Sequence, residues 1–293
     1  MKKILVSIIL SIFVIFLFDI SWYSFDIYKM NKLLAKKNIS SRYKWHYTII
    51  TKPAGIIDVV DFDFREPINI KSDKAPILIF GCSYAFGHYL NPNQNFGANL
   101  AKLTKRSVYN FGMPGASVQQ FLVLLENKDF QITPPPEYII YVYMNDYIRR
   151  MYTKFYDSYE RQYPIRYKLQ NNDLILDKDT YVSLYLYKKL NCFLSKLKAE
   201  NPKYNKINMS NFSKYINKAN LLIKEKFPNS KFIIYVYEEE ENYDWSIIEN
   251  IGVKVVINTD LNNVIAMKMS DGHPSAEAWK YFTPIFIKEA GIK

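Results

Sequence analysis

The chain has 293 residues, 49% of them hydrophobic, and a formal net charge of +11. Its only two cysteines, Cys82 and Cys192, exclude a framework of several disulfide bonds. The positive charge would suit anionic glycans, phospholipid headgroups or nucleic acid. The lysines are, however, scattered along the whole chain without a dense basic block, which argues against nucleic-acid binding.

The first element in chain order is an apolar segment, Ile4 to Ile20, which follows Met1-Lys2-Lys3. It reaches the lower length limit of a membrane-spanning helix, about 17 residues, and exceeds the usual apolar core of a cleaved signal peptide, about 7 to 15 residues. No Ala-x-Ala cleavage pattern follows, and Trp22 and Tyr23 suit a membrane interface. We predict an uncleaved transmembrane signal-anchor over residues 1–24. A cleaved signal peptide and a buried helix are the alternatives.

Lysines lie on both sides of this apolar segment, so the positive-inside rule does not decide its orientation. The short N-terminal tail favours export of the large domain. We therefore expect a membrane-anchored protein whose main domain is extracytoplasmic, either periplasmic or at the cell surface.

The remaining chain predicts a stem over residues 25–70 and one α/β domain over residues 71–293. Apolar strands are expected at residues 77–80, 107–109, 138–143, 231–237 and 253–257. Helices are expected at residues 95–104, from Ser117, at 213–226 and from Pro274 onward. Continuous apolar strands joined by helices are typical of a parallel sheet covered on both faces. We predict a three-layer α/β/α sandwich with roughly five parallel strands.

The first predicted strand ends in a glycine-framed serine, Gly81-Cys82-Ser83-Tyr84-Ala85-Phe86-Gly87. Ligands bind at the carboxyl ends of parallel strands, and a glycine turn there lets a substrate approach both a hydroxyl and backbone N–H groups. Ser83 is therefore the candidate nucleophile, with the adjacent Cys82 as a minor alternative. The same pattern also fits an ordinary turn in which a serine caps the next helix.

A serine nucleophile normally needs a base at neutral pH, and the chain holds three histidines. His46 lies in a Tyr- and Lys-rich stretch away from any predicted strand end. His88 is on the nucleophile's own segment and would have to fold back to reach Ser83. His273 is preferred because it lies in an acidic turn, Ser270 to Ser275, before the last predicted helix. An exposed histidine at a helix start is the alternative reading of this turn.

Two further turns, Asn110 to Gly115 and Asn145-Asp146, follow the second and third predicted strands. Acyl transfer also requires hydrogen-bond donors aimed at a developing oxyanion, which such turns can supply. Asn, Asp and Gly are also simply the common turn residues. Because the carboxyl ends of parallel strands share one edge of a sheet, we expect these turns to converge with Ser83 and His273.

In order and spacing, the four segments resemble the SGNH, or GDSL-type, hydrolase family over roughly residues 75 to 290. The resemblance implies a flavodoxin-like fold and a serine esterase that needs no metal or other cofactor. The catalytic residues that it implies are Ser83 as nucleophile and His273 as base. The oxyanion donors that it implies are the Ser83 and Gly115 backbone amides and the Asn145 side chain.

The chain departs from the family pattern mainly at the triad acid. The family has Asp three residues before the histidine, where this chain has Ser270, while Asp271 is only two residues before His273. Three readings stay open. Asp271 orients the imidazole from a shifted turn, a backbone carbonyl replaces it in a dyad, or activity is reduced. Cys82 also replaces an Asp of the pattern, and Met144 replaces a Gly.

Residues 147–212 are long for a connection and are predicted to be an insertion that rims the site. Tyrosines and arginines of this insertion could contact a sugar. Alternatively, they pack the insertion against the domain. They are Tyr152, Tyr156, Tyr159, Tyr163, Tyr167, Arg149, Arg150, Arg161 and Arg166. By position, Tyr84 and Asp146 are expected to contact substrate. Glu238 to Glu241 are predicted to form a solvated acidic loop, with the selection of cationic substrates as the alternative.

These patterns and the resemblance predict a membrane-anchored, extracytoplasmic serine ester hydrolase. By analogy with the family, and from the expected location, its substrate is predicted to be an O-acyl group on cell-envelope carbohydrate. One alternative is an O-acyltransferase that acts on a glycan together with a membrane acyltransferase partner. The other is a catalytically impaired protein that binds glycans or assembles envelope components. No metal or other cofactor is expected.

Overall fold

The computed structural model describes residues 45–51, 58–65, 67–127, 130–145, 147–148, 150, 167–170, 173–176, 205–239 and 243–293, together with Val14. Apart from Val14, the predicted signal-anchor lies outside these residues, as does most of the predicted insertion. Within the described ranges, no helix combines the length and the apolar character that crossing a membrane requires.

The centre of the fold is a five-stranded sheet in which all neighbouring strands are parallel. Its strands are β3 (Ile77–Gly81), β4 (Val108–Gly112), β5 (Tyr138–Tyr143), β8 (Lys231–Val236) and β9 (Lys254–Ile257). Their order across the sheet is β4-β3-β5-β8-β9, which is the 2-1-3-4-5 order of flavodoxin-like folds. The prediction of a parallel α/β sheet is thereby confirmed.

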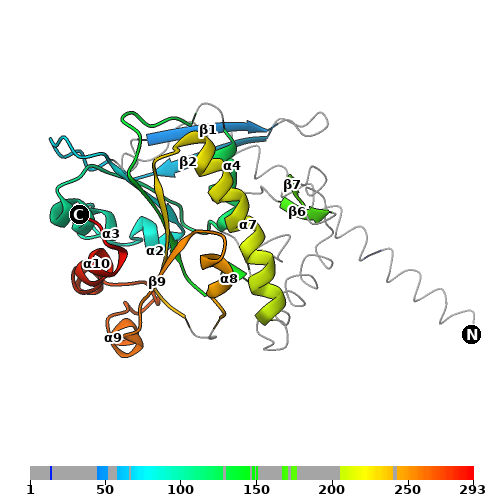
Figure 1. Cartoon of the computed structure of the whole chain (residues 1–293). Helices are drawn as coiled ribbons and strands as arrows, with labels where there is room; N and C mark the ends of the chain where they lie inside the picture. Colours follow the sequence, from blue (N-terminus) through cyan, green and yellow to red (C-terminus); the bar gives the residue numbers. More distant parts are fainter. Residues whose placement is uncertain are drawn as a thin grey trace, which may run out of the picture.

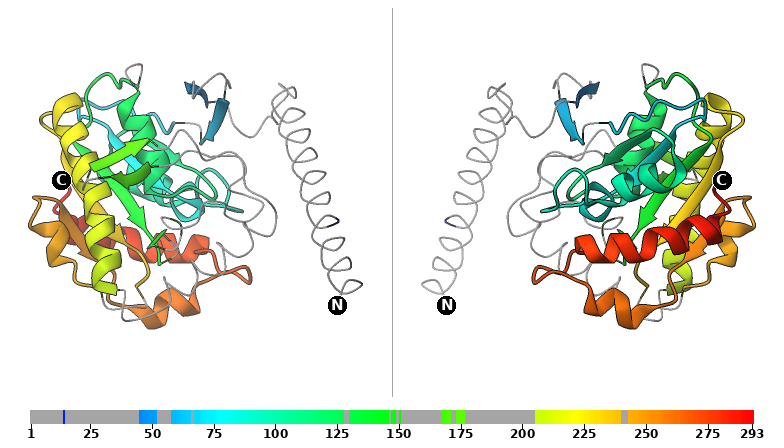
Figure 2. Two further views of the ribbon diagram at one scale, coloured as in Figure 1. Left: turned by 90° about the vertical axis from the view of Figure 1, so that its right-hand side faces the viewer. Right: turned by 90° about the vertical axis from the view of Figure 1, so that its left-hand side faces the viewer.

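Helices cover both faces of this sheet (Figure 1, Figure 2). One face carries α3 (Phe96–Thr104) and α10 (Ala276–Ala290), which contact each other. The opposite face carries α4 (Val118–Glu126) and α7 (Asn205–Lys226), with the short α8 (Ser246–Glu249) packed against α7. The molecule therefore has the three layers that the sequence predicts.

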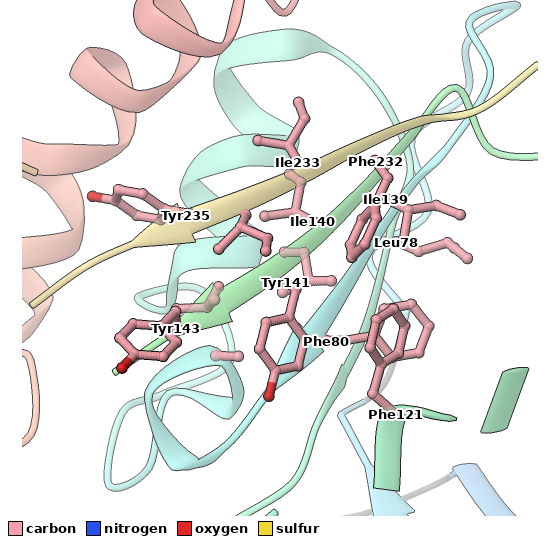
Figure 3. Packing of buried hydrophobic residues seen from close by; sticks show 14 of the residues in the cluster. Leu78, Phe80, Phe121, Ile139, Ile140, Tyr141, Tyr143, Phe232, Ile233 and Tyr235 are labelled. Carbon is pink, nitrogen blue, oxygen red and sulfur yellow. The ribbon is translucent and has the colours of Figure 1, made fainter. Parts of the chain in front are cut away.

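Aromatic rings fill the space between the sheet and its helices. Figure 3 shows Phe80, Phe121 and Tyr141 gathered on the α4 face, where the Phe121 ring lies 4.4 Å from Phe80 and 5.2 Å from Tyr141. On the other face, the Phe96 ring of α3 lies 5.5 Å from Tyr235 and 5.1 Å from Trp279 of α10. Burying each such side chain contributes roughly 1.5 to 3 kcal/mol to folding. This packing makes the sheet a firm support for the turns at its edge.

Several described elements were not predicted. The stem contains an antiparallel hairpin of β1 (Trp45–Thr51) and β2 (Asp58–Phe64), and the insertion contains a second hairpin of β6 (Tyr167–Gln170) and β7 (Asp173–Leu176). The α7 helix begins inside the predicted insertion, and α9 (Leu261–Ala266) follows β9. The end of the stem also joins the main domain, because Ile68 forms an antiparallel bridge with Val108.

Two predicted boundaries need correction. The strand expected at residues 107–109 runs on to Gly112, so Asn110 belongs to β4 instead of the following turn. The last helix begins at Ala276, with Ser275 as its N-cap, instead of at Pro274. Pro274 lies in a bridge with Lys268, which keeps its backbone extended outside the helix.

Candidate active site

Three strands end at the same level of the sheet. Gly81, the last residue of β3, pairs with Gly112 of β4 and with Val142 of β5. The segments that follow these strands therefore leave from one edge, as predicted. Further links tie them together: the Met113 N–H donates to the Gly81 carbonyl at 3.0 Å, and the Cys82 Sγ lies 3.1 Å from the Met144 Sδ.

Ser83 is the first residue of α2 (Ser83–Phe86), a single helical turn that packs closely on β3 and β4. Two glycines make this packing possible. A Cβ on Gly81 would lie 2.8 Å from the Ala85 Cβ, and a Cβ on Gly112 would lie 2.4 Å from the Phe86 nitrogen. Asn110 of β4 holds the same turn, since its side-chain amide donates to the Ala85 carbonyl at 2.7 Å. The nucleophile candidate is thus held by β4 as well as by β3.

Ser83, His273 and Asp271 form a continuous chain of contacts. The Ser83 Oγ lies 2.8 Å from the His273 Nε2, and the His273 Nδ1 lies 3.0 Å from the Asp271 Oδ2. The other Asp271 oxygen accepts the His273 backbone N–H at 3.1 Å. Between them, Gly272 has φ +86°, a left-handed conformation that glycine adopts readily. This tight turn lets Asp271 reach the imidazole from two residues away, which agrees with the first of the three readings.

The charges at these three residues fit together. Desolvation of the Asp271 carboxyl acts to raise its pKa. The His273 backbone N–H, the charge of the His273 ring and the hydrogen bond from that ring act in the opposite direction, and together they hold the pKa of Asp271 below its ordinary value. An ionised carboxylate only accepts hydrogen bonds, so the His273 Nδ1 carries the proton. The unprotonated Nε2 then faces the Ser83 hydroxyl and can accept its hydrogen.

The expected oxyanion donors lie on the segments that meet at this edge. As the first residue of α2, Ser83 has a backbone N–H without an acceptor inside the helix. Gly115, with φ +82°, lies in a turn whose next carbonyl, that of Ala116, accepts a hydrogen bond from Arg150 at 2.7 Å. Asn145 follows β5 at the same edge, and its side-chain nitrogen is buried.

Tyr84 is only 6% exposed, and its hydroxyl lies 2.9 Å from the Gly272 carbonyl and 3.1 Å from the Glu238 Oε2. Its ring centroid lies 5.4 Å from that of His273. The hydroxyl is therefore engaged within the protein, and the contact of Tyr84 with substrate stays a prediction. Asp146, the other expected substrate contact, lies outside the described residues.

The predicted solvated loop needs correction at Glu238. It is 7% exposed and forms an ion pair with Lys268, so it does not belong to a solvated acidic loop. Burial, and then the charge of Glu238, raise the pKa of Tyr84. The signal for Glu238 is its place two residues after the end of β8, because β8 ends level with β5 at the same edge. That position indicates proximity to the site, whereas the acidic run around it is typical of a solvated loop.

Arg65 is a functional candidate that sequence reasoning missed, and His88, which it set aside as the base, also lies close to the site. The His88 ring lies 5.3 Å from the His273 ring, and its pKa is lowered, chiefly by burial and then by the charge of His273. Arg65 donates hydrogen bonds to the carbonyls of the turn before and after His88. Nothing in the sequence around Arg65, which lies in the predicted stem, indicates this role.

Three other residues are sequence candidates for the nucleophile, the base or a disulfide partner. Cys82 is fully buried with its sulfur against Met144, whereas Ser83 is partly exposed, so the geometry favours Ser83 as nucleophile. Cys192 lies outside the described residues. His46 is in β1, where it pairs with Asp63 of β2. In the parts of the chain that the structure describes, no group of three or more His, Cys, Asp or Glu side chains is placed to hold a metal ion.

Comparison with known proteins gives only remote similarities. No family model matches the sequence, and no curated protein matches it. One similar solved structure is a member of the lipolytic protein G-D-S-L family from Veillonella parvula, with 14% identity, a TM-score of 0.44, and coverage of 73% of this chain and 96% of that chain. Another is a mutant acetyl-xylooligosaccharide esterase from Geobacillus Stearmophilus, with 16% identity, a TM-score of 0.42, and coverage of 77% and 98%.

A third is an acetyl xylan esterase from Butyrivibrio proteoclasticus, with 12% identity, a TM-score of 0.42, and coverage of 81% of this chain and 70% of that chain. Similarity at this level concerns the general arrangement of strands and helices. Fold alone does not determine a reaction, so the assignment of one rests on the geometry of the site.

Proposed function

We propose that this chain is a serine ester hydrolase of the SGNH type that its four motifs resemble. The observation that carries the proposal is the contact chain from the Ser83 Oγ to the His273 Nε2, at 2.8 Å, and from the His273 Nδ1 to Asp271, at 3.0 Å. An alcohol is a weak nucleophile at neutral pH, and a base in hydrogen-bond contact is what activates it. A third group that orients the base completes the arrangement.

The first step is acylation of the enzyme. His273 takes the Ser83 proton on Nε2 while the Ser83 Oγ attacks the ester carbonyl carbon, and Asp271 stabilises the imidazolium that forms. The carbonyl oxygen becomes negatively charged in the tetrahedral intermediate. The Ser83 and Gly115 amides and the Asn145 side chain are the donors for this oxyanion. The ester bond then breaks, and the alcohol leaves with the proton from Nε2.

The second step releases the acyl group. A water molecule gives a proton to the His273 Nε2 and attacks the acyl-serine carbonyl, which forms a second tetrahedral intermediate at the same donors. Collapse of this intermediate returns the proton to Ser83 and frees the carboxylic acid. The partial exposure of Ser83 and His273 is consistent with access for both ester and water.

The test of this reaction is labelling of the full chain in detergent with a fluorophosphonate, followed by mass spectrometry of the modified peptide. We expect an adduct on Ser83 that is absent in Ser83→Ala and strongly slowed in His273→Ala. The Cys82→Ala variant is the matched control and should still be labelled. An adduct at another residue, or none in a folded sample, would contradict the proposal.

We propose further that the ester is an O-acyl group on cell-envelope carbohydrate and that residues 1–24 anchor the domain outside the cytoplasm. The support is the apolar N-terminal segment without a cleavage pattern, together with the family resemblance. Acylated glycans incubated with the full chain should release free carboxylic acid. Transfer of the acyl group to a second glycan without free acid would instead indicate the acyltransferase.

The anchor is tested separately, by fractionation of cells. The full chain should sediment with membranes, and a protease added outside the cytoplasmic membrane should digest the main domain. A chain found in the soluble cytoplasmic fraction would contradict both the anchor and the envelope substrate.

A further inference from the structure

Tyr89 places an exposed aromatic ring beside the candidate base. Its side chain is 68% exposed. The ring centroid lies 4.0 Å from the His88 ring, edge to face, and 6.0 Å from the His273 ring at an interplanar angle of 86°. His88 and Tyr89 therefore form a continuous aromatic surface that starts at the imidazole in contact with Ser83. We call these two residues the aromatic wall.

The backbone of Tyr89 is strained. Its φ is +63°, in the left-handed region, which is energetically unfavourable for a residue other than glycine. Because the ring is mostly exposed, little of that cost is recovered by burying it. Strained residues of this kind cluster at functional sites, so the strained backbone of Tyr89 indicates a role in function.

The turn that carries the wall is firmly held. Arg65 donates hydrogen bonds to the carbonyls of Phe86, at 2.8 Å, and of Leu90, at 2.9 Å, and to that of Gly87 between them. Its guanidinium also lies 4.5 Å from the Phe86 ring. The His88 N–H donates to the Ser83 carbonyl at 3.0 Å, which ties the turn directly to the nucleophile segment. The wall is therefore preorganised before a substrate arrives.

The reaction chemistry indicates which part of an ester meets this wall. In the proposed mechanism the leaving alcohol takes its proton from the His273 Nε2, so the alcohol half of the ester lies beside His273. Two of the three oxyanion donors, Gly115 and Asn145, lie on other segments, and the third is the backbone amide of Ser83 itself. The wall borders His273, and burial, followed by the charge of His273, lowers the pKa of His88, which favours the neutral form of that ring.

On these grounds, and resting on the proposed esterase function, we propose that Tyr89 and His88 form the binding subsite for the alcohol half of the substrate and select a ring-shaped alcohol. An exposed aromatic face stacks on the C–H face of a pyranose or of another saturated ring, whereas a short linear alcohol gains little from it.

The test compares two acetates, cyclohexyl acetate and ethyl acetate, on the full chain and three variants, so that the intrinsic reactivity of each ester cancels between variants. Tyr89→Asn removes the ring and keeps a residue that tolerates the left-handed conformation, while Tyr89→Phe keeps the ring. Tyr281→Asn is the matched control, because Tyr281 is also exposed but lies on α10 with its hydroxyl near Asp260. The quantity measured is the ratio of kcat/KM for the ring ester to that for ethyl acetate.

We expect Tyr89→Asn to lower this ratio about fivefold to tenfold, while Tyr89→Phe and Tyr281→Asn preserve it. A second readout uses labelling alone: methyl β-glucopyranoside should slow fluorophosphonate labelling of Ser83 in the unaltered chain and in Tyr89→Phe, but not in Tyr89→Asn. An unchanged ratio, or equal protection in all variants, would overturn the subsite while labelling of Ser83 still upheld the esterase. Absence of labelling in the unaltered chain would overturn both.

Discussion

The Tyr84 hydroxyl lies 2.9 Å from the carbonyl oxygen of Gly272, and so joins the residue after the candidate nucleophile to the residue before the candidate base. The same hydroxyl is 3.1 Å from the Glu238 carboxylate, which is paired with Lys268. A hydroxyl has a single hydrogen, so the two acceptors share it. This bridge sets the separation between Ser83 and the turn that carries His273.

Removal of that hydroxyl in Tyr84→Phe should slow catalysis more than it affects folding. Without the bridge, the His273 turn loses one restraint, and small misplacements of catalytic groups cost about ten- to a hundredfold in rate. We expect a fall of about tenfold in kcat with little change in KM, measured by steady-state ester hydrolysis. Tyr109→Phe is a control, because Tyr109 lies near the start of β4, before the strand reaches the site edge. A fall in both variants alike would contradict the positioning role.

The ion pair between Lys268 and Glu238 should matter for stability. Breaking a buried pair by removing one partner leaves a buried charge and costs about 3 to 5 kcal/mol. Lys268→Met should therefore lower the free energy of unfolding in urea by about 3 kcal/mol, and adding Glu238→Gln should recover part of the loss. Lys231→Met is the control, because Lys231 is 65% exposed and 3.9 Å from Glu137, and such pairs contribute at most about 1 kcal/mol.

Gly112→Ala should displace α2, the helical turn that begins with Ser83. The new Cβ would lie 2.4 Å from the Phe86 nitrogen and 2.8 Å from the Ala85 carbonyl carbon, so α2 has to move. We expect a loss of about 1 to 3 kcal/mol in unfolding free energy together with slower labelling of Ser83. Gly97→Ala is matched to it, since the nearest atoms there are 3.2 Å away or more. Equal labelling rates in the two variants would count against the role assigned to Gly112.

Asp271→Asn should reduce ester hydrolysis sharply while the protein stays folded. An amide can stabilise the wrong tautomer of the imidazole and cannot balance its positive charge, a change that costs about 10⁴-fold in a serine protease triad. Asp260→Asn removes a carboxylate that contacts Asn263 and Tyr281, away from Ser83, and serves as control. If the two variants hydrolyse esters at similar rates, the chain works through a dyad.

His88 should contribute to the pH dependence of stability. Its pKa in the folded chain is lowered from 6.5, mainly by burial and then by the charge of His273, with Arg65 acting in the same direction and Asp271 against it. Below pH 6.5 the unfolded chain therefore binds more protons at His88 than the folded chain does. The free energy of unfolding consequently falls as the pH drops. In thermal unfolding between about pH 8 and about pH 5.5, His88→Gln should lose less stability than the unaltered chain. A larger loss of thermal stability in His88→Gln than in the unaltered chain would contradict a lowered pKa of His88.

The sequence by itself determined the strands and the edge at which they meet. The apolar runs ending at Gly81 and Tyr143 predict buried parallel strands, and parallel strands bring their carboxyl ends together whatever the details of packing. Ser83 and Asn145 follow such strands, so their positions in the sequence are enough to place them at one edge. An apolar run and the polar residue that follows it are neighbours in the chain, so both can be recognised from the sequence alone.

Tertiary structure alone decided which side chains meet there. Asp271 reaches His273 through the left-handed turn at Gly272, and Tyr84 turns inward to Glu238, a residue 154 positions away. Arg65 supports the turn of Tyr89 from a segment that the sequence presents as a stem. Contacts of this kind depend on how elements that are remote in sequence pack together. No local periodicity or turn preference indicates which residue the partner will be.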